Sequence, residues 1–161
     1  MAITVGTDTF VSLADANAYF GDRLYSTVWT GATDADREKA LRMATSTLSR
    51  ERWAGSITSI NQLLAWPRTG TTDAEGRPIG TGTIPQPVKD ATCELALALL
   101  TEDRTADDGS RNVKSVQAGS VRVEYAGAAP VRRLPDFVAT IIAPLLTPPG
   151  GASQNSVPMV F

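Results

Sequence analysis

Apolar side chains recur at helical spacing along the first third of the chain. Residues 13–24 place alanine, tyrosine, phenylalanine and leucine on one face of a helix, and Ser12 stands where a hydroxyl caps a helix N-terminus. A second helix is predicted over residues 35–52 because its apolar stripe is continuous and its first turn is acidic. Thr33 is its predicted N-cap. The linker between the two helices is expected to tuck Trp29 against the second one.

The most apolar stretch begins at Pro85 or Gln86 and continues for about 18 residues. This width of apolar surface predicts a helix that is buried on most sides and forms the centre of the core. A fourth helix is predicted to begin at Pro135, and Pro144 is expected to kink or end it. Four side chains are expected to be structural core residues: Trp66, Leu95, Leu99 and Ile141.

Apolar and polar residues alternate most clearly in the region around residues 113–125. Two short strands at about 113–117 and 120–125, joined by a turn at Ala118-Gly119, predict a β-hairpin. An isolated two-stranded hairpin is only marginally stable in water. We therefore expect it to lie on the helices or to pair with another chain.

The segment between the second and third predicted helices is rich in glycine and proline. Residues 53–60 are predicted to form a loop, and 61–65 a short helical turn that Pro67 ends. Residues 68–85 predict a long loop with a tight turn at 73–76. A phosphate-binding function is disfavoured here, because no lysine followed by serine or threonine ends a glycine motif. A loop of this length in a small domain is typical of a functional or unstructured segment.

The last fifteen residues, 147–161, contain too much proline, glycine, serine and asparagine to support regular structure. They end in an apolar segment, Val-Pro-Met-Val-Phe, which predicts an extended arm that docks into a groove of a partner. A flexible end is the alternative. The chain is thus divided into a helical domain over residues 1–146, which includes the hairpin, and a C-terminal arm over 147–161.

The composition excludes several functional classes. The net charge is −2, so the chain lacks the overall positive charge that would attract a polyanion. Histidine is absent, so the commonest general base is missing as well. Cys93 is the sole cysteine, and a core position is expected for it. We expect no enzyme activity, no catalytic residues, no metal and no cofactor. No signal peptide or membrane-spanning helix is expected either.

Several motifs together resemble a known family. They are FVSLADANAYF, LLAWPRTGTTDAEGRPI, IPQPVKDATCELALALL, VRVEYAG and LPDFVATIIAPLL. In this order they resemble the tailed-bacteriophage proteins catalogued as DnaT-like, whose members are similar to head-tail connector (adaptor, head-completion) proteins. The resemblance extends from about Thr9 to Leu146, and AWPRTG followed by IPQPVKDATCELAL is its most specific part.

The predicted fold class is mainly α, namely a bundle of about four helices with one β-hairpin, a long Gly/Pro-rich loop and an extended C-terminal arm. The resemblance implies the compact helical bundle and its projecting hairpin, whereas the arm after Thr147 is not part of the resemblance and is inferred from its residues. It also implies a structural protein of the virion neck, assembled in the host cytoplasm as a homo-oligomeric ring, expected to be a dodecamer. Its partners would be the portal protein and the next neck, tail-completion or tail-terminator protein. Genome DNA would pass through the lumen without sequence-specific binding, and no membrane would be involved.

Four arginines and the apolar end of the arm are the candidate interface residues for the portal, a neighbouring subunit or the next ring. They are Arg68, Arg77, Arg132, Arg133, Val157, Pro158, Met159, Val160 and Phe161. For Arg68 a structural ion pair is an open alternative. The competing function is that of a DnaT-like replication accessory protein that binds single-stranded DNA. This function requires a basic groove and exposed stacking aromatic residues.

Overall fold

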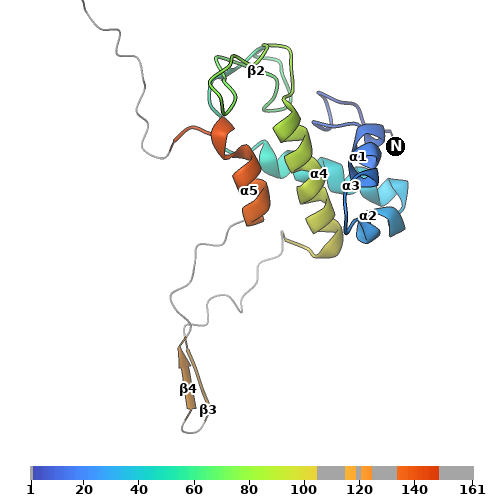
Figure 1. Ribbon diagram of the computed structural model, residues 1–161, viewed down its shortest axis with the longest axis vertical. Coiled ribbons are helices and arrows are strands. Elements are labelled where there is room, and N and C mark those ends of the chain that lie inside the picture. Colours follow the sequence, from blue (N-terminus) through green and yellow to red (C-terminus); the bar gives the residue numbers. More distant parts are fainter. Residues whose placement is uncertain (1, 105–114, 119–120, 125–133, 149–161) are drawn as a thin grey trace, which may run out of the picture.

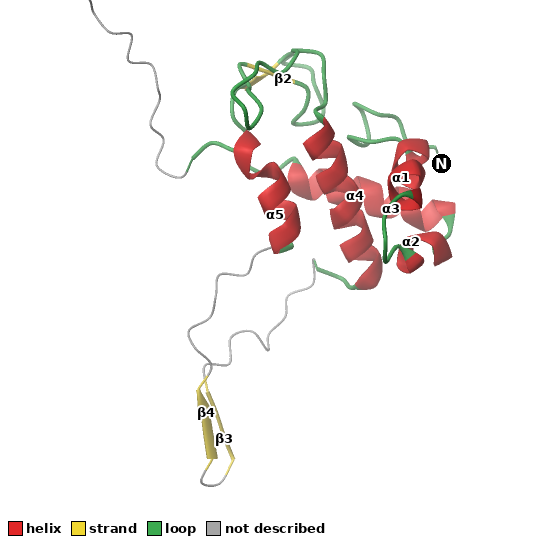
Figure 2. Cartoon of the chain, viewed as in Figure 1, coloured by secondary structure: helices red, strands yellow, loops and turns green. Residues whose placement is uncertain are grey.

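The computed structural model describes residues 2–104, 115–118, 121–124 and 134–148. The described part is mainly helical, with two short two-stranded antiparallel sheets (Figure 2). The helices are α1 (Leu13–Gly21), α2 (Thr27–Gly31), α3 (Asp34–Leu48), α4 (Gln86–Thr101) and α5 (Asp136–Ile142), with a 3-10 turn at Ala143–Leu145. The strands are β1 (Ser56–Ile57), β2 (Arg68–Thr69), β3 (Ser115–Ala118) and β4 (Val121–Glu124). The predicted fold class is confirmed.

Helix α4 is the central element, as its apolar sequence predicts. It lies between α5 on one side and α1 and α2 on the other, α3 crosses behind it, and its most extensive packing is against α3 (Figure 1). Leu95 and Trp66 are buried in this core, as expected. Leu99 and Ile141 are only partly buried and pack against its margin.

The predicted helix caps are confirmed, but both helices end at earlier residues than predicted. The Ser12 hydroxyl accepts a hydrogen bond from the Asp15 amide at 3.0 Å, and the Thr33 hydroxyl accepts one from Asp36 at 3.2 Å. Helix α1 ends at Gly21 rather than residue 24, and α3 ends at Leu48 rather than residue 52. Glycine has a low helix propensity, and this accounts for the end of α1.

The linker that holds Trp29 contains the short helix α2, which was not predicted. Its single turn places the Trp29 ring in the core, stacked on Phe20 with the ring centroids 4.4 Å apart. Five residues are too few to show a helical period, so tertiary packing rather than sequence pattern determines this helix.

The predicted loop at 53–60 also contains a strand. β1 pairs with β2 in a two-residue ladder, with Ser56 opposite Thr69. The helical turn expected at 61–65 is absent, since these residues form turns and bends. The tight turn at 73–76 is confirmed by a hydrogen bond of 3.0 Å from the Gly76 amide to the Asp73 carbonyl.

The β3–β4 hairpin is confirmed with slightly narrower bounds, and its register places Ser115 opposite Glu124 and Ala118 opposite Val121. The effect expected of Pro144 is also confirmed, because α5 ends at Ile142 and gives way to the 3-10 turn. Among the described residues no helix has the length and apolarity needed to cross a bilayer.

Candidate functional site

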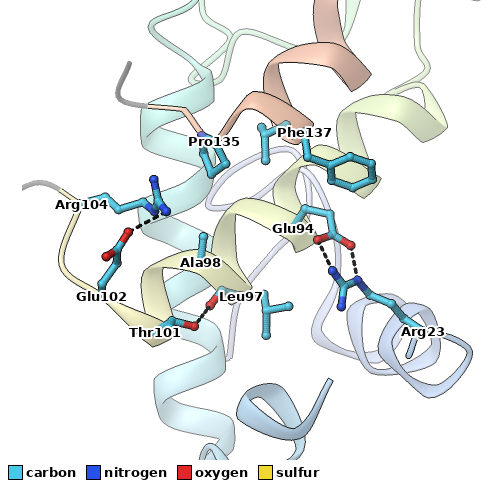
Figure 3. Close-up of a pocket in the computed structure, with 10 residues that line it drawn as sticks. Arg23, Glu94, Leu97, Ala98, Thr101, Glu102, Arg104, Pro135 and Phe137 are labelled. Carbon is cyan, nitrogen blue, oxygen red and sulfur yellow. Dashed lines mark hydrogen bonds and ion pairs between the residues drawn. The ribbon is translucent and has the colours of Figure 1, made fainter. Parts of the chain in front are cut away.

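A pocket of about 360 Å³ lies where the end of α4 meets the start of α5 (Figure 3). We call it the α4–α5 pocket. Leu97, Ala98, Pro135, Phe137 and Val138 supply its apolar lining. Its volume is in the range of pockets that take small apolar ligands or side chains. Phe137 is an exposed part of this lining, since 59% of it is accessible to solvent.

Two ion pairs flank this apolar lining. Arg104 binds Glu102 at 2.6 Å on one side, and Arg23 binds Glu94 on the other (Figure 3). Each pair brings one positive and one negative charge. The α4–α5 pocket therefore presents an apolar wall whose neighbouring charges are already compensated.

Glu94 is a carboxylate almost completely buried on the central helix, with 6% of its side chain exposed. Arg23 donates to both carboxylate oxygens, from Nη2 to Oε2 at 2.9 Å and from Nε to Oε1, and the Tyr19 hydroxyl donates to Oε1 at 2.7 Å. A buried charge of this kind needs partners such as these. Burial and the hydrogen bond to Glu94 raise the pKa of Tyr19. The bond to Glu94 likewise raises the pKa of Arg23.

Polarity alone would place Glu94 on the exposed edge of its helix, but the structure buries it. Its position follows the period of the buried residues Ala91 and Leu95, which was the available signal. The polarity of Glu94 argues against this position, because an isolated buried carboxylate is rare. Its partner Arg23 lies 71 positions away in the sequence, so no local pattern connects them.

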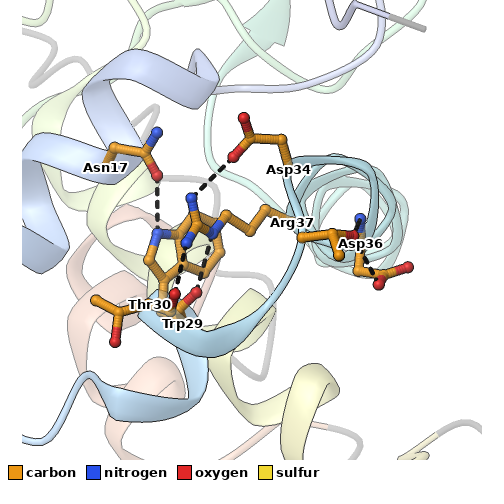
Figure 4. A network of polar contacts seen from close by, with 7 residues as sticks. Asn17, Trp29, Thr30, Asp34, Asp36 and Arg37 are labelled. Atoms are coloured by element: carbon orange, nitrogen blue, oxygen red, sulfur yellow. Dashed lines mark hydrogen bonds and ion pairs between the residues drawn. The ribbon is translucent and has the colours of Figure 1, made fainter.

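A second polar network joins α1, α2 and α3 (Figure 4). Arg37 donates to the carbonyls of Trp29 at 2.9 Å and Thr30 at 3.0 Å, which are in the last turn of α2. It also binds Asp34 at 2.8 Å, and the Trp29 indole donates to Asn17 Oδ1 at 2.9 Å. A cation that caps the C-terminal carbonyls of so short a helix has a structural role.

Arg68, a predicted interface residue, binds backbone carbonyls within its own chain. Its guanidinium donates to Ala54 and Gly55 at 2.7 Å each, to Ala65 at 3.2 Å and to Trp53 at 3.4 Å. Burial lowers its pKa. These contacts favour a structural role, as the sequence analysis allowed, although hydrogen bonds to carbonyls replace the expected ion pair.

Arg77 is the other predicted interface residue that the structure describes. It is exposed and binds Asp73 at 2.8 Å across the tight turn. The remaining predicted interface residues lie outside the described residues, so their assignment stays a prediction: Arg132, Arg133, Val157, Pro158, Met159, Val160 and Phe161.

Cys93 lies in the core, as expected, with 1% of it exposed. Burial, together with the charge of nearby Asp90, raises the pKa of the Cys93 thiol to about 12. The thiolate is the reactive form of cysteine, so this side chain is inert at neutral pH. Within the described part of the chain, no group of three or more acidic or cysteine side chains is arranged to hold a metal ion.

Comparison with known proteins gives one match, which covers nearly the whole chain. The family model described as "Putative DnaT-like ssDNA binding protein" matches residues 2–160. No curated protein and no solved structure matches the chain.

Proposed function

The chain belongs to this DnaT-like family, and we propose that it is a structural head-tail adaptor of a tailed-phage virion. In this proposal it assembles as a ring between the portal and the next neck or tail component, with genome DNA in the lumen. Support comes from the motifs that resemble connector proteins, from the unpaired β3–β4 hairpin and from the place where the hairpin is attached to the helical domain. The unpaired hairpin is the most important of these.

β3 and β4 pair only with each other among the described residues. Each strand therefore has an outer edge without a strand partner in the described part of the chain. A two-stranded hairpin alone is marginally stable, and an open edge is a template for a strand of another chain. A neighbouring subunit in a ring would supply such a strand at every position. This unpaired hairpin is the observation that carries the proposal.

The attachment of the hairpin also suits an assembly. It is inserted between α4 and α5, and Thr101 at the end of α4 and Pro135 before α5 both line the α4–α5 pocket. The chain thus leaves and re-enters the helical domain at one place. Elements inserted in this way can be repositioned without disturbing the core, because few core contacts depend on them.

The charge of the chain is compatible with DNA passing through a lumen. The net charge is −2, and Arg23, Arg37, Lys39 and Arg77 bind carboxylates within the chain. Cations that are already compensated attract phosphates weakly, so they would let a duplex slide rather than hold it.

The test is co-production with the portal protein of the same phage. We expect the wild-type chain to form portal-bound rings visible by electron microscopy. Replacing residues 113–125 by a Gly/Ser linker should abolish the rings while circular dichroism still shows a folded helical domain. Changing only the turn residues 119–120 is the matched control, because it keeps both strands. Rings that form normally without the hairpin would refute its role.

The C-terminal arm is tested separately. Removing residues 153–161 should weaken the particle, since the proposal gives the apolar segment a docking site on a partner. Normal neck assembly by the truncated chain would contradict this part of the proposal and leave the hairpin part intact.

Single-stranded DNA binding is the second candidate function, because the family description names it. It requires aromatic side chains on which bases stack beside a basic groove. Trp29, Trp53 and Trp66 are each at most 5% exposed, so none of the tryptophans is available for stacking. A shift of labelled single-stranded DNA at physiological salt that weakens as salt rises would favour this function over the adaptor.

A further inference from the structure

The loop between β1 and β2 presents two large aliphatic side chains to solvent. Ile60 is 90% exposed and Leu63 is 74% exposed. We call residues 58–64 the apolar loop tip, and it contains no charged residue. Exposed apolar residues that occur singly need no explanation, but two on one short loop mark a candidate interaction site.

The apolar loop tip is held in shape by a side chain at its centre. Gln62 Oε1 accepts hydrogen bonds from the amide and hydroxyl of Thr58, at 3.2 and 2.8 Å. Gln62 Nε2 donates to the carbonyls of Leu64 at 2.6 Å and Pro67 at 2.9 Å. One amide thus bonds both sides of the loop and leaves Ile60 and Leu63 outside.

The base of the loop is fixed as well. The β1–β2 ladder closes it, and three of the four carbonyl contacts of Arg68, to Trp53, Ala54 and Gly55, fasten β2 to the segment before β1. The fourth contact, to Ala65, lies within the loop. A loop ordered in advance loses little conformational entropy on binding, which favours association through its tip. These contacts therefore make the apolar loop tip a preorganised projection.

We propose that the apolar loop tip of one copy of this chain docks into the α4–α5 pocket of a second copy. The uncharged tip matches a pocket whose flanking ion pairs compensate their own charges. The partly exposed Phe137 ring would be covered by Ile60 and Leu63. Such a match of apolar surface without net charge disfavours a nucleic acid or a charged peptide as the partner, and the ring proposed above places a second copy of this chain beside each subunit.

Two further pockets are less suitable. The one between α2, α3 and α4 has Met43 and Val28 in its lining, but these are only 44% and 41% exposed and would gain less from being covered. The one beside the tight turn has Asp73, Glu75 and Arg77 in its lining, and this set has a net negative charge.

The tip and the pocket lie at opposite ends of the α4–α5 pair, which excludes docking within one chain. The loop base is joined to the 3-10 turn after α5 by the bond from the Ala54 amide to the Leu145 carbonyl, at 2.9 Å. The pocket lies at the start of α5 (Figures 1 and 3). Contact between two different patches is heterologous, and it produces a closed ring when the rotation between copies closes. The inference therefore deepens the proposed ring, and rests on it, by naming one contact between its subunits.

The test uses the purified full chain without a portal, so that its result is independent of the adaptor function. We expect weak self-association in sedimentation velocity at high protein concentration. The tip variant Ile60→Ser/Leu63→Ser and the pocket variant Phe137→Ser should each reduce association at least tenfold. Met43→Ser, in the less suitable pocket, is the matched control and should associate like the wild type.

The decisive step is to mix the two variants. The tip variant retains an intact pocket and the pocket variant retains an intact tip, so an equimolar mixture should form a one-to-one heterodimer and nothing larger.

Three outcomes in sedimentation would each overturn the inference. They are a mixture that stays monomeric, a wild-type chain that stays monomeric at millimolar concentration, and variants that associate normally. Tip-dependent flotation with phosphatidylethanolamine–phosphatidylglycerol vesicles without self-association would also overturn it. Portal-bound rings formed by the tip variant would refute this contact and leave the adaptor function standing.

Discussion

At the scale of single residues, the pairing of Glu94 with Arg23 has a measurable consequence for stability. Removing one partner of a buried ion pair leaves an uncompensated charge, which costs about 3–5 kcal/mol when both groups are buried. Arg23 is 30% exposed, so Arg23→Met should lower the free energy of unfolding by about 2–3 kcal/mol, below that range. Chemical denaturation followed by circular dichroism measures this change.

The double variant Arg23→Met/Glu94→Met is the control for the charge effect. It removes the buried charge together with its partner, so we expect it to be more stable than Arg23→Met alone. A double variant less stable than the single one would show that packing, rather than charge, dominates at Glu94. The Tyr19 hydroxyl would also lose its acceptor in the double variant, which limits how much stability is recovered.

At the scale of elements, the close approach of β1 and β2 depends on one glycine. Gly55 has φ +69°, and a Cβ there would lie 2.2 Å from the Thr69 carbonyl oxygen. Gly55→Ala should therefore cost more than the 1–2 kcal/mol typical of positive φ alone, by roughly a further 1 kcal/mol or more. Gly70→Ala is the matched control, since Gly70 has φ +71° with nothing within 4 Å. Equal losses in unfolding free energy for both variants would contradict the importance of the contact.

The elements differ in how far the sequence could predict them. Ser12, Thr33 and Pro144 were interpreted correctly because capping and helix termination depend on neighbouring residues. Helix α2 and the β1–β2 ladder were missed because each is too short to show a period. The α4–α5 pocket was missed for a different reason, since its lining comes from segments far apart in the sequence. Local patterns carry no information about which distant segments meet.

At the scale of the whole molecule, the protonation state of the core sets how stability varies at alkaline pH. Cys93 has a pKa of about 12 in the folded chain against a usual value of 9.0. The pKa of Tyr19 is also raised above 10.0 by burial and by its bond to Glu94. In both cases the folded state favours the protonated form, so this stability is fully present below pH 9. It is lost as pH rises from about 9, where the unfolded thiol begins to release its proton.

We therefore expect the free energy of unfolding to fall between pH 9 and 12, with Cys93 contributing up to about 1.4 kcal/mol per pH unit. Urea unfolding at a series of pH values under reducing conditions measures the slope of unfolding free energy against pH.

Cys93→Ala will be less stable at neutral pH because it leaves a small cavity, but its slope above pH 9 should be shallower than that of the wild type. Tyr19→Phe removes the other titrating hydroxyl and should flatten the slope chiefly above pH 10. Identical slopes for the wild type and Cys93→Ala would mean that the thiol is accessible to ionisation in the folded chain, contrary to the packing of α4.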